Sequence, residues 1–132
     1  FVSYLFADGI DDRYTFVCWD QRGAGRTYEH NKSIDADNDT VSLDRALADL
    51  DELVDKMCER YGQDKVIIMG HSYGSYLGAR YVYDHPEKVS HYIGIGQVVD
   101  FADGEKQSYN DALTKAIAAG EDTSDMERAW GD

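Results

Sequence analysis

Three short apolar runs alternate with stretches of helical periodicity over the first hundred residues. Residues 14–19 are a nearly continuous run of β-branched and aromatic side chains, and residues 66–69 and 92–95 form two further runs. Runs of this length and composition indicate buried strands of a mostly parallel sheet. Apolar positions recur at helical spacing between the first two runs: Leu43, Ala46, Leu47, Leu50, Leu53, Val54, Met57, Cys58 and Tyr61. The order strand, helix, strand, helix, strand predicts an α/β sheet with right-handed crossovers.

The helix boundaries follow from capping residues. Thr40 is a plausible N-cap for the first helix and Gly62 a plausible stop, which predicts a helix over residues 40–61. Its leucine side should pack against the sheet. A second helix should run from Ser72 to about Tyr83, before Pro86. From Phe101 onward no strand pattern returns, and two amphipathic helices are expected.

Composition narrows the class of protein. The chain has 132 residues, enough for one domain, and a formal net charge of -13, with 26 acidic against 13 basic residues. Such a surface repels nucleic acid and anionic membranes, so neither is expected as a partner. We interpret the acidic excess as a solvated surface, with a long-range preference for cationic substrates such as free amino termini as the alternative.

Cysteine usage and hydropathy point to an intracellular setting. Cys18 lies in an apolar run and Cys58 on a helical stripe, so both are expected to be small buried hydrophobes in a reducing compartment. No membrane-length apolar segment occurs in the sequence. We therefore predict a cytoplasmic protein. No spacing of ligand residues resembles a metal site, and no cofactor is expected.

The chemistry centres on the pentapeptide Gly70-His71-Ser72-Tyr73-Gly74. It follows directly on the apolar run 66–69 and precedes small residues at helical spacing. Strand, Gly-x-Ser-x-Gly and helix together are the signature of a nucleophile elbow, a turn so tight that small residues are needed two positions either side of the serine. Ser72 is the predicted nucleophile, rather than a serine of an ordinary turn. The backbone N–H of Tyr73 would supply one oxyanion donor.

Two more motifs accompany the elbow. Asp20-Gln21-Arg22-Gly23-Ala24-Gly25-Arg26-Thr27 follows the first apolar run, and Asp84-His85-Pro86-Glu87-Lys88-Val89 follows the elbow helix. In this order and spacing they resemble the α/β-hydrolase superfamily, and within it the proline iminopeptidase (prolyl aminopeptidase) branch. The resemblance covers most of residues 1–100. It implies three mostly parallel strands with flanking helices, a partial α/β-hydrolase core over residues 1–100, and the start of a helical cap (lid) over residues 101–132.

The resemblance also implies a function. A serine hydrolase of this branch would remove an N-terminal, proline-like residue from small peptides through an acyl-enzyme on Ser72. The sequence departs from the branch in two places. At the elbow, His71 and Tyr73 replace a usual Gly and Trp, and after the third strand residues 95–98 stand where the branch tends to carry an Arg-Gly pair. An esterase or lactonase acting on small acyl substrates therefore stays open. A non-catalytic binding protein with the same fold is the third reading.

A catalytic histidine and acid remain to be found. His71 should point to the other side of the elbow as pocket wall, and His85 should be a helix-end residue. His91 falls at the opposite sheet edge, while His30 precedes Ser72 in the chain, against the order Ser, acid, His of this fold. The base is therefore expected outside the chain. Asp100 is a weak candidate for the acid, otherwise a turn or cap-hinge residue.

Two further expectations concern the loop after the first strand and the sheet itself. Asp20 and Arg22 are either substrate binders or, as we favour, residues that tie the loop to its surroundings. By the resemblance, the chain is an internal fragment that lacks the family's third strand. In the family this strand lies between the strands that correspond to residues 14–19 and 66–69. Residues 14–19 should then not pair with residues 66–69. Expressed alone, the segment should be inactive and poorly soluble or oligomeric.

Overall fold

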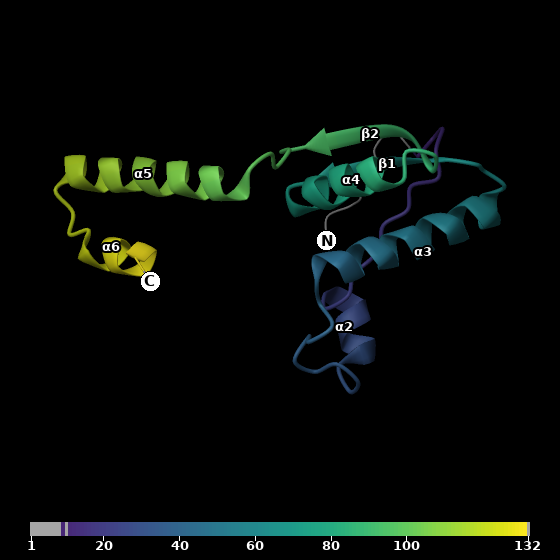
Figure 1. Cartoon of the computed structure of the whole chain (residues 1–132), viewed down its shortest axis with the longest axis horizontal. Coiled ribbons are helices and arrows are strands. Elements are labelled where there is room, and N and C mark those ends of the chain that lie inside the picture. Colours follow the sequence, from purple (N-terminus) through teal and green to yellow (C-terminus); the bar gives the residue numbers. More distant parts are fainter. Residues whose placement is uncertain (1–8, 10, 132) are drawn as a thin grey trace.

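Two parallel strands and the helix between them form the centre of the structure (Figure 1). A computed structural model describes residue 9 and residues 11–131. The central unit is β1 (Val66–His71), α4 (Tyr73–Asp84) and β2 (Val89–Ile95). The other elements described are α2 (Gly25–Asn31), α3 (Leu43–Tyr61), α5 (Phe101–Ala119) and α6 (Ser124–Gly131).

The predicted α/β sheet is confirmed, with two strands instead of three. β1 and β2 pair in parallel, with Ile68 opposite Tyr92 and Gly70 opposite Gly94. The expectation of a strand at residues 14–19 is wrong, because this run forms no ladder within the described part of the chain. A strand needs a neighbour for its N–H and C=O groups, and β1 is not that neighbour. The separate expectation that residues 14–19 would not pair with β1 is confirmed.

The missing ladder also changes the environment of Cys18. This side chain is exposed, while Cys58 is half-buried, and both are free thiols. The expectation that Cys18 is buried is therefore wrong. Tyr14 and Val17 of the same run are likewise more than two-fifths exposed, at 57% and 44%. Only the end of the run is covered by other parts of the chain, since Trp19 packs against the hydrophobic core.

The N-cap of α3 lies two residues later in the chain than expected. Ser42 is the N-cap, and its hydroxyl oxygen accepts a hydrogen bond from the Arg45 amide at 3.2 Å. Thr40, the expected cap, instead donates its hydroxyl to Asp35. Gly62 ends the helix as predicted, with φ of 61°, a left-handed conformation that glycine adopts without strain.

The core lies between α3, α4 and the start of β2. Its buried members are Leu50, Val54, Leu77, Tyr81 and Val89. α3 packs mainly on α4, which corrects the expectation that its leucine side covers the sheet directly, and Val89 of β2 belongs to the same core. The reason is that α4 already covers this face of the two-stranded sheet.

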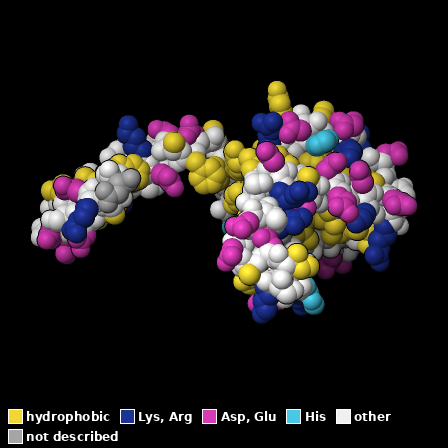
Figure 2. Space-filling view, turned by 60° about the horizontal axis from the view of Figure 1, so that its bottom comes forward, with side chains coloured by type: hydrophobic (Ala, Val, Ile, Leu, Met, Phe, Trp, Pro, Cys, Tyr) yellow, Lys and Arg dark blue, Asp and Glu magenta, His cyan; other side chains and the backbone are white. Residues whose placement is uncertain are grey.

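α5 and α6 form an arm that extends away from this core (Figure 1). Neither helix has a fully buried residue. The Tyr109 and Trp130 rings stack at 4.3 Å and tie the two helices together. At the start of the arm, which follows β2, Phe101 meets Tyr76 of α4 edge to face at 5.8 Å. Figure 2 shows hydrophobic side chains at this junction. The two expected helices are confirmed, and the role of residues 101–132 as a cap stays a prediction.

Among the described residues, no helix combines the length and the hydropathy that are needed to span a membrane.

Candidate active site

Ser72 connects β1 to α4 in a strained backbone conformation. Its φ and ψ are 52° and -122°, and it is one of two described non-glycine residues with positive φ. Such a conformation costs on the order of 1–3 kcal/mol and persists only where its surroundings hold it. The Ser72 amide donates to the Ile95 carbonyl at 3.0 Å, which ties the turn to the end of β2.

The turn needs glycine on its N-terminal side. A Cβ on Gly70 would lie 2.3 Å from the Gly74 carbonyl oxygen and 2.7 Å from the Ser75 Cα. A Cβ on Gly74 would meet no atom within 4 Å. The expectation that small residues are needed on both sides of Ser72 is therefore correct for Gly70 and wrong for Gly74. The crowding arises because α4 folds back over the end of β1 at Gly70, while Gly74 faces open space.

The side chain of Ser72 is available for chemistry. Ser72 is exposed and occupies the N-cap position of α4, yet its side chain makes no capping hydrogen bond. Tyr73 is the first residue of this helix, so its amide has no intrahelical acceptor and points out with the positive end of the helix dipole. The arrangement brings an exposed hydroxyl and a backbone donor to one place at the sheet edge.

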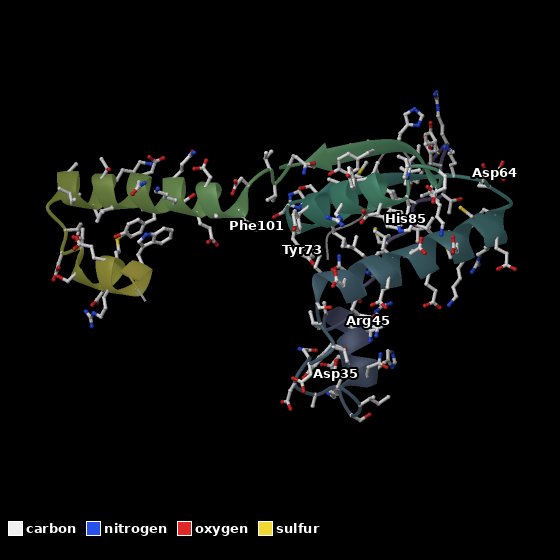
Figure 3. All side chains as sticks on the ribbon, in the orientation of Figure 1. Asp35, Arg45, Asp64, Tyr73, His85 and Phe101 are labelled. Atoms are coloured by element: carbon white, nitrogen blue, oxygen red, sulfur yellow. The ribbon has the colours of Figure 1, made fainter. Side chains whose placement is uncertain are left out.

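The four histidines lie in four different settings. His71 is exposed at the end of β1, directly before Ser72, and His91 is exposed on β2. His85 is the C-cap of α4, with Nδ1 3.6 Å from a Glu87 carboxylate oxygen, and Figure 3 shows it at the far end of that helix from Tyr73. His30 lies in the last turn of α2. The prediction of His85 as a helix-end residue is confirmed.

The carboxylate of Asp100 has a structural task. Asp100 is the N-cap of α5, and its Oδ1 accepts a hydrogen bond from the Asp103 amide at 3.0 Å. This contact stabilises the first turn of the arm, which fits the turn or hinge reading. Its candidacy as the triad acid or a substrate-binding residue, like that of His71, stays a prediction.

The loop after residue 19 is tied to its surroundings as we favoured. Arg22 makes a two-point ion pair with Asp49 of α3, with Nε–Oδ2 of 2.9 Å and Nη2–Oδ1 of 2.8 Å. The hydrogen bonds that Arg22 donates to Asp49 raise the pKa of the Arg22 guanidinium. Asp20 Oδ2 accepts from the Arg26 amide at 2.9 Å, and a Cβ on Gly25 would lie 2.6 Å from that carboxyl group. The sequence analysis missed Asp49 as the partner of Arg22, because only the fold brings this residue of α3 next to the loop.

A small cavity borders the elbow. Its volume is about 130 Å³, and its lining comes from the loop at Trp19, from the start of α3 at Ala46 and from Tyr73. Arg22 and Asp49, which form the ion pair, also line it. No group of three or more potential metal ligands lies together in the described residues.

Comparison with known proteins places the chain in a family. The sequence profile of the alpha/beta hydrolase fold family matches residues 1–129. The chain belongs to the alpha/beta hydrolase fold family. No solved structure gave a significant match.

Two curated relatives resemble the chain over much of its length. It is 28% identical over 100 residues, 76% of the chain, to "Probable aminopeptidase YbaC" of Bacillus subtilis (strain 168). It is 34% identical over 83 residues, 63% of the chain, to "Probable proline iminopeptidase" of Streptomyces coelicolor. The matched region spans 30% and 24% of the lengths of these two relatives. Both names denote peptidases, and the chain is a hydrolase-fold protein with peptidase-named relatives.

Proposed function

We propose that the protein is a serine hydrolase that removes an N-terminal, proline-like residue from small peptides, with Ser72 as nucleophile. The observation that carries this proposal is the conformation of Ser72, which is strained, exposed and placed between a strand and a helix N-terminus. Strain of this kind is expected where the backbone must present a reactive side chain. The peptidase names of the two relatives support the choice of substrate class.

In the proposed reaction, Ser72 Oγ attacks the carbonyl carbon of the substrate and passes its proton to a histidine base. The negative charge that develops on the carbonyl oxygen is met by the Tyr73 N–H and a second donor. The amine leaves with a proton from the histidine, and water then hydrolyses the acyl-enzyme. We propose that the base, the acid and the second donor come from other parts of the full-length protein. Loss of one oxyanion donor costs about 10²–10³ in turnover, so the segment alone should be inactive.

Esterase or lactonase activity is the second candidate. The observation that favours it is the cavity beside Tyr73, which Trp19, Val41 and Ala46 line with apolar surface. An uncharged acyl group would fit such a lining as well as a proline ring would. A non-catalytic binding role is the third reading, and measured turnover of a substrate would exclude it.

The decisive experiment uses the full-length protein and a Ser72→Ala variant. Wild type should hydrolyse proline arylamides and react covalently with an organophosphonate probe, and Ser72→Ala should lose both activities. Ser108→Ala, an exposed serine on α5, serves as the matched control and should keep both. Ester turnover without release from proline arylamides would replace the peptidase by the esterase. Labelling that persists in Ser72→Ala would refute Ser72 as the nucleophile.

A further inference from the structure

Ser75, three residues beyond Ser72, has a buried hydroxyl that joins the elbow to the segment after β2. It is fully buried, at 0% exposure, and is the one buried polar residue in the described part of the chain. Its Oγ donates to the Ser72 carbonyl oxygen at 2.6 Å and accepts from the Val98 amide at 3.0 Å. One side chain therefore bonds both the strained turn and the backbone that leads into α5.

The carbonyl of Ser75 is held from the other side. The Tyr92 hydroxyl lies 2.8 Å from the Ser75 carbonyl oxygen and 2.6 Å from Gln97 Oε1. Gln97 Nε2 donates to the Ser75 carbonyl at 3.3 Å and to the Val98 carbonyl at 2.9 Å. Burial raises the pKa of the Tyr92 phenol.

Gly94 makes room for this arrangement. A Cβ on Gly94 would lie 2.4 Å from Gln97 Oε1 and 3.1 Å from the Tyr92 hydroxyl oxygen. Glycine at this position of β2 therefore lets Gln97 fold back over Tyr92 toward α4. Gln97 falls in the residues 95–98 that depart from the pattern of the resembling branch. In this chain its amide has a defined task, which is to bond the first turn of α4 to the root of the arm.

Together these contacts surround Ser72. Its amide donates to Ile95, and its carbonyl accepts from both the amide of Ser75, at 2.8 Å, and the hydroxyl of Ser75. We infer that Ser75 is a positioning residue for Ser72, and that Gln97 extends its effect to the segment carrying α5. The inference rests on the proposed function, because it assigns Ser75 to the presentation of the proposed nucleophile.

The network also has a consequence for the arm. Val98 stands three residues before Phe101, where α5 begins, and its amide bonds the same hydroxyl that bonds Ser72. A shift of the arm at its root therefore moves Ser75, and with it the carbonyl of Ser72. A nucleophile misplaced by about 1 Å can lose about 10²-fold in rate. Weakening this network should thus reduce reactivity more than substrate binding.

The test compares Ser75→Ala and Gln97→Leu with Ser90→Ala in the full-length protein. Ser90 Oγ also donates to a backbone carbonyl, that of Val66 at 3.0 Å, at the opposite end of the two strands. The readouts are the second-order rate of organophosphonate labelling at Ser72, kcat and KM, all well below the melting temperature. We expect Ser75→Ala to lower the labelling rate and kcat by about tenfold or more, with KM within about twofold. Gln97→Leu should lower both rates by a smaller factor, and Ser90→Ala should change neither.

Each outcome decides the matter. Ser75→Ala and Gln97→Leu proteins that fold and react at the wild-type rate would overturn the inference. A rise in KM at unchanged kcat and labelling rate would also overturn it, because positioning of the nucleophile does not act that way. If Ser75→Ala does not fold, Gln97→Leu decides, since Gln97 is exposed and its replacement leaves the core intact. Failure of wild type to label at Ser72 would instead refute the proposed function itself.

Discussion

The hydroxyl of the fully buried Tyr81 on α4 donates a 2.8 Å hydrogen bond to the carboxylate of Asp51 on α3. Lys88 Nζ lies 2.7 Å from the same carboxylate oxygen and 2.6 Å from Asp55. These contacts join α3, α4 and the segment entering β2 at the end of α4 opposite the elbow. Burial, followed by the hydrogen bond to Asp51, raises the pKa of the Tyr81 phenol.

Tyr81→Phe should lower the free energy of unfolding by about 1–3 kcal/mol, because it removes a hydrogen bond to a charged acceptor from a buried site. Urea unfolding would measure the difference. Tyr83, which is 80% exposed on the same helix, offers the control. Tyr83→Phe should stay within about 0.5 kcal/mol of wild type. Equal effects of the two substitutions would show that the Tyr81–Asp51 bond adds nothing to stability.

Asp51 should make stability depend on pH in the acid range. The pKa of the Asp51 carboxyl lies below its ordinary value of 3.8, and the largest cause is the hydrogen bond from Lys88. A carboxyl whose pKa is lower in the folded state makes its full contribution to stability at pH values above its unfolded pKa. This contribution is lost as the pH falls through the folded pKa. The stability gap between wild type and Asp51→Asn should therefore be largest near neutral pH and should shrink below about pH 4.

Urea midpoints at several pH values would measure that gap. Asp64→Asn, at an exposed position between α3 and β1, is the control. The difference between its urea midpoint and that of wild type should be the same at every pH. A gap for Asp51→Asn that stays constant down to the acid limit would contradict the assignment.

Gly70→Ala and Gly74→Ala should behave in opposite ways. The Cβ added at Gly70 would meet backbone atoms at 2.3 Å, so the elbow must shift, with loss of organophosphonate labelling and of at least about 1–3 kcal/mol of stability. Gly74 lies within α4 with open space beside it, so alanine there should be neutral or stabilise by about 0.4–1 kcal/mol. Labelling rates and melting temperatures of the two variants would settle the asymmetry, and equal damage from both would argue against it.

Leu50→Ala should lower the free energy of unfolding by about 2–5 kcal/mol, because Leu50 is 6% exposed at the centre of the core and its truncation leaves a cavity. Chemical denaturation would quantify the loss. Ile117 on α5, 61% exposed, loses the same kind of side chain with little burial. Ile117→Ala should cost less than about 1 kcal/mol. A small effect at Leu50 would mean that the core lies elsewhere.

The 132-residue chain expressed alone should associate. The described residues hold five buried apolar side chains and a two-stranded sheet, a small core for independent stability. Large apolar side chains such as Ile67 and Ile93 on the strands are 42% exposed. Figure 2 shows acidic groups spread over the body among hydrophobic side chains. Light scattering should report oligomers, and a monomer with a sharp thermal transition would refute this expectation.

The sequence alone determined the elements whose signals are local. The apolar run 66–69, the glycine at position 70 and the periodic stripe of α3 each act through neighbours a few residues away. The strand β1, the tight turn at Ser72 and the end of α3 at Gly62 were therefore predictable. The same holds for the parallel pairing of β1 and β2, because a strand–helix–strand order leaves little other choice.

Tertiary structure decided everything that depends on a distant partner. Residues 14–19 have the composition of a strand, but a strand exists only beside another, and none pairs with them in the described chain. Cys18 is exposed for the same reason. The bonds of Ser75 to Val98 and of Arg22 to Asp49 join residues 23 and 27 positions apart. No local pattern identifies such pairs, because hydrogen bonds between groups far apart in the sequence form only once packing has brought them within about 3 Å.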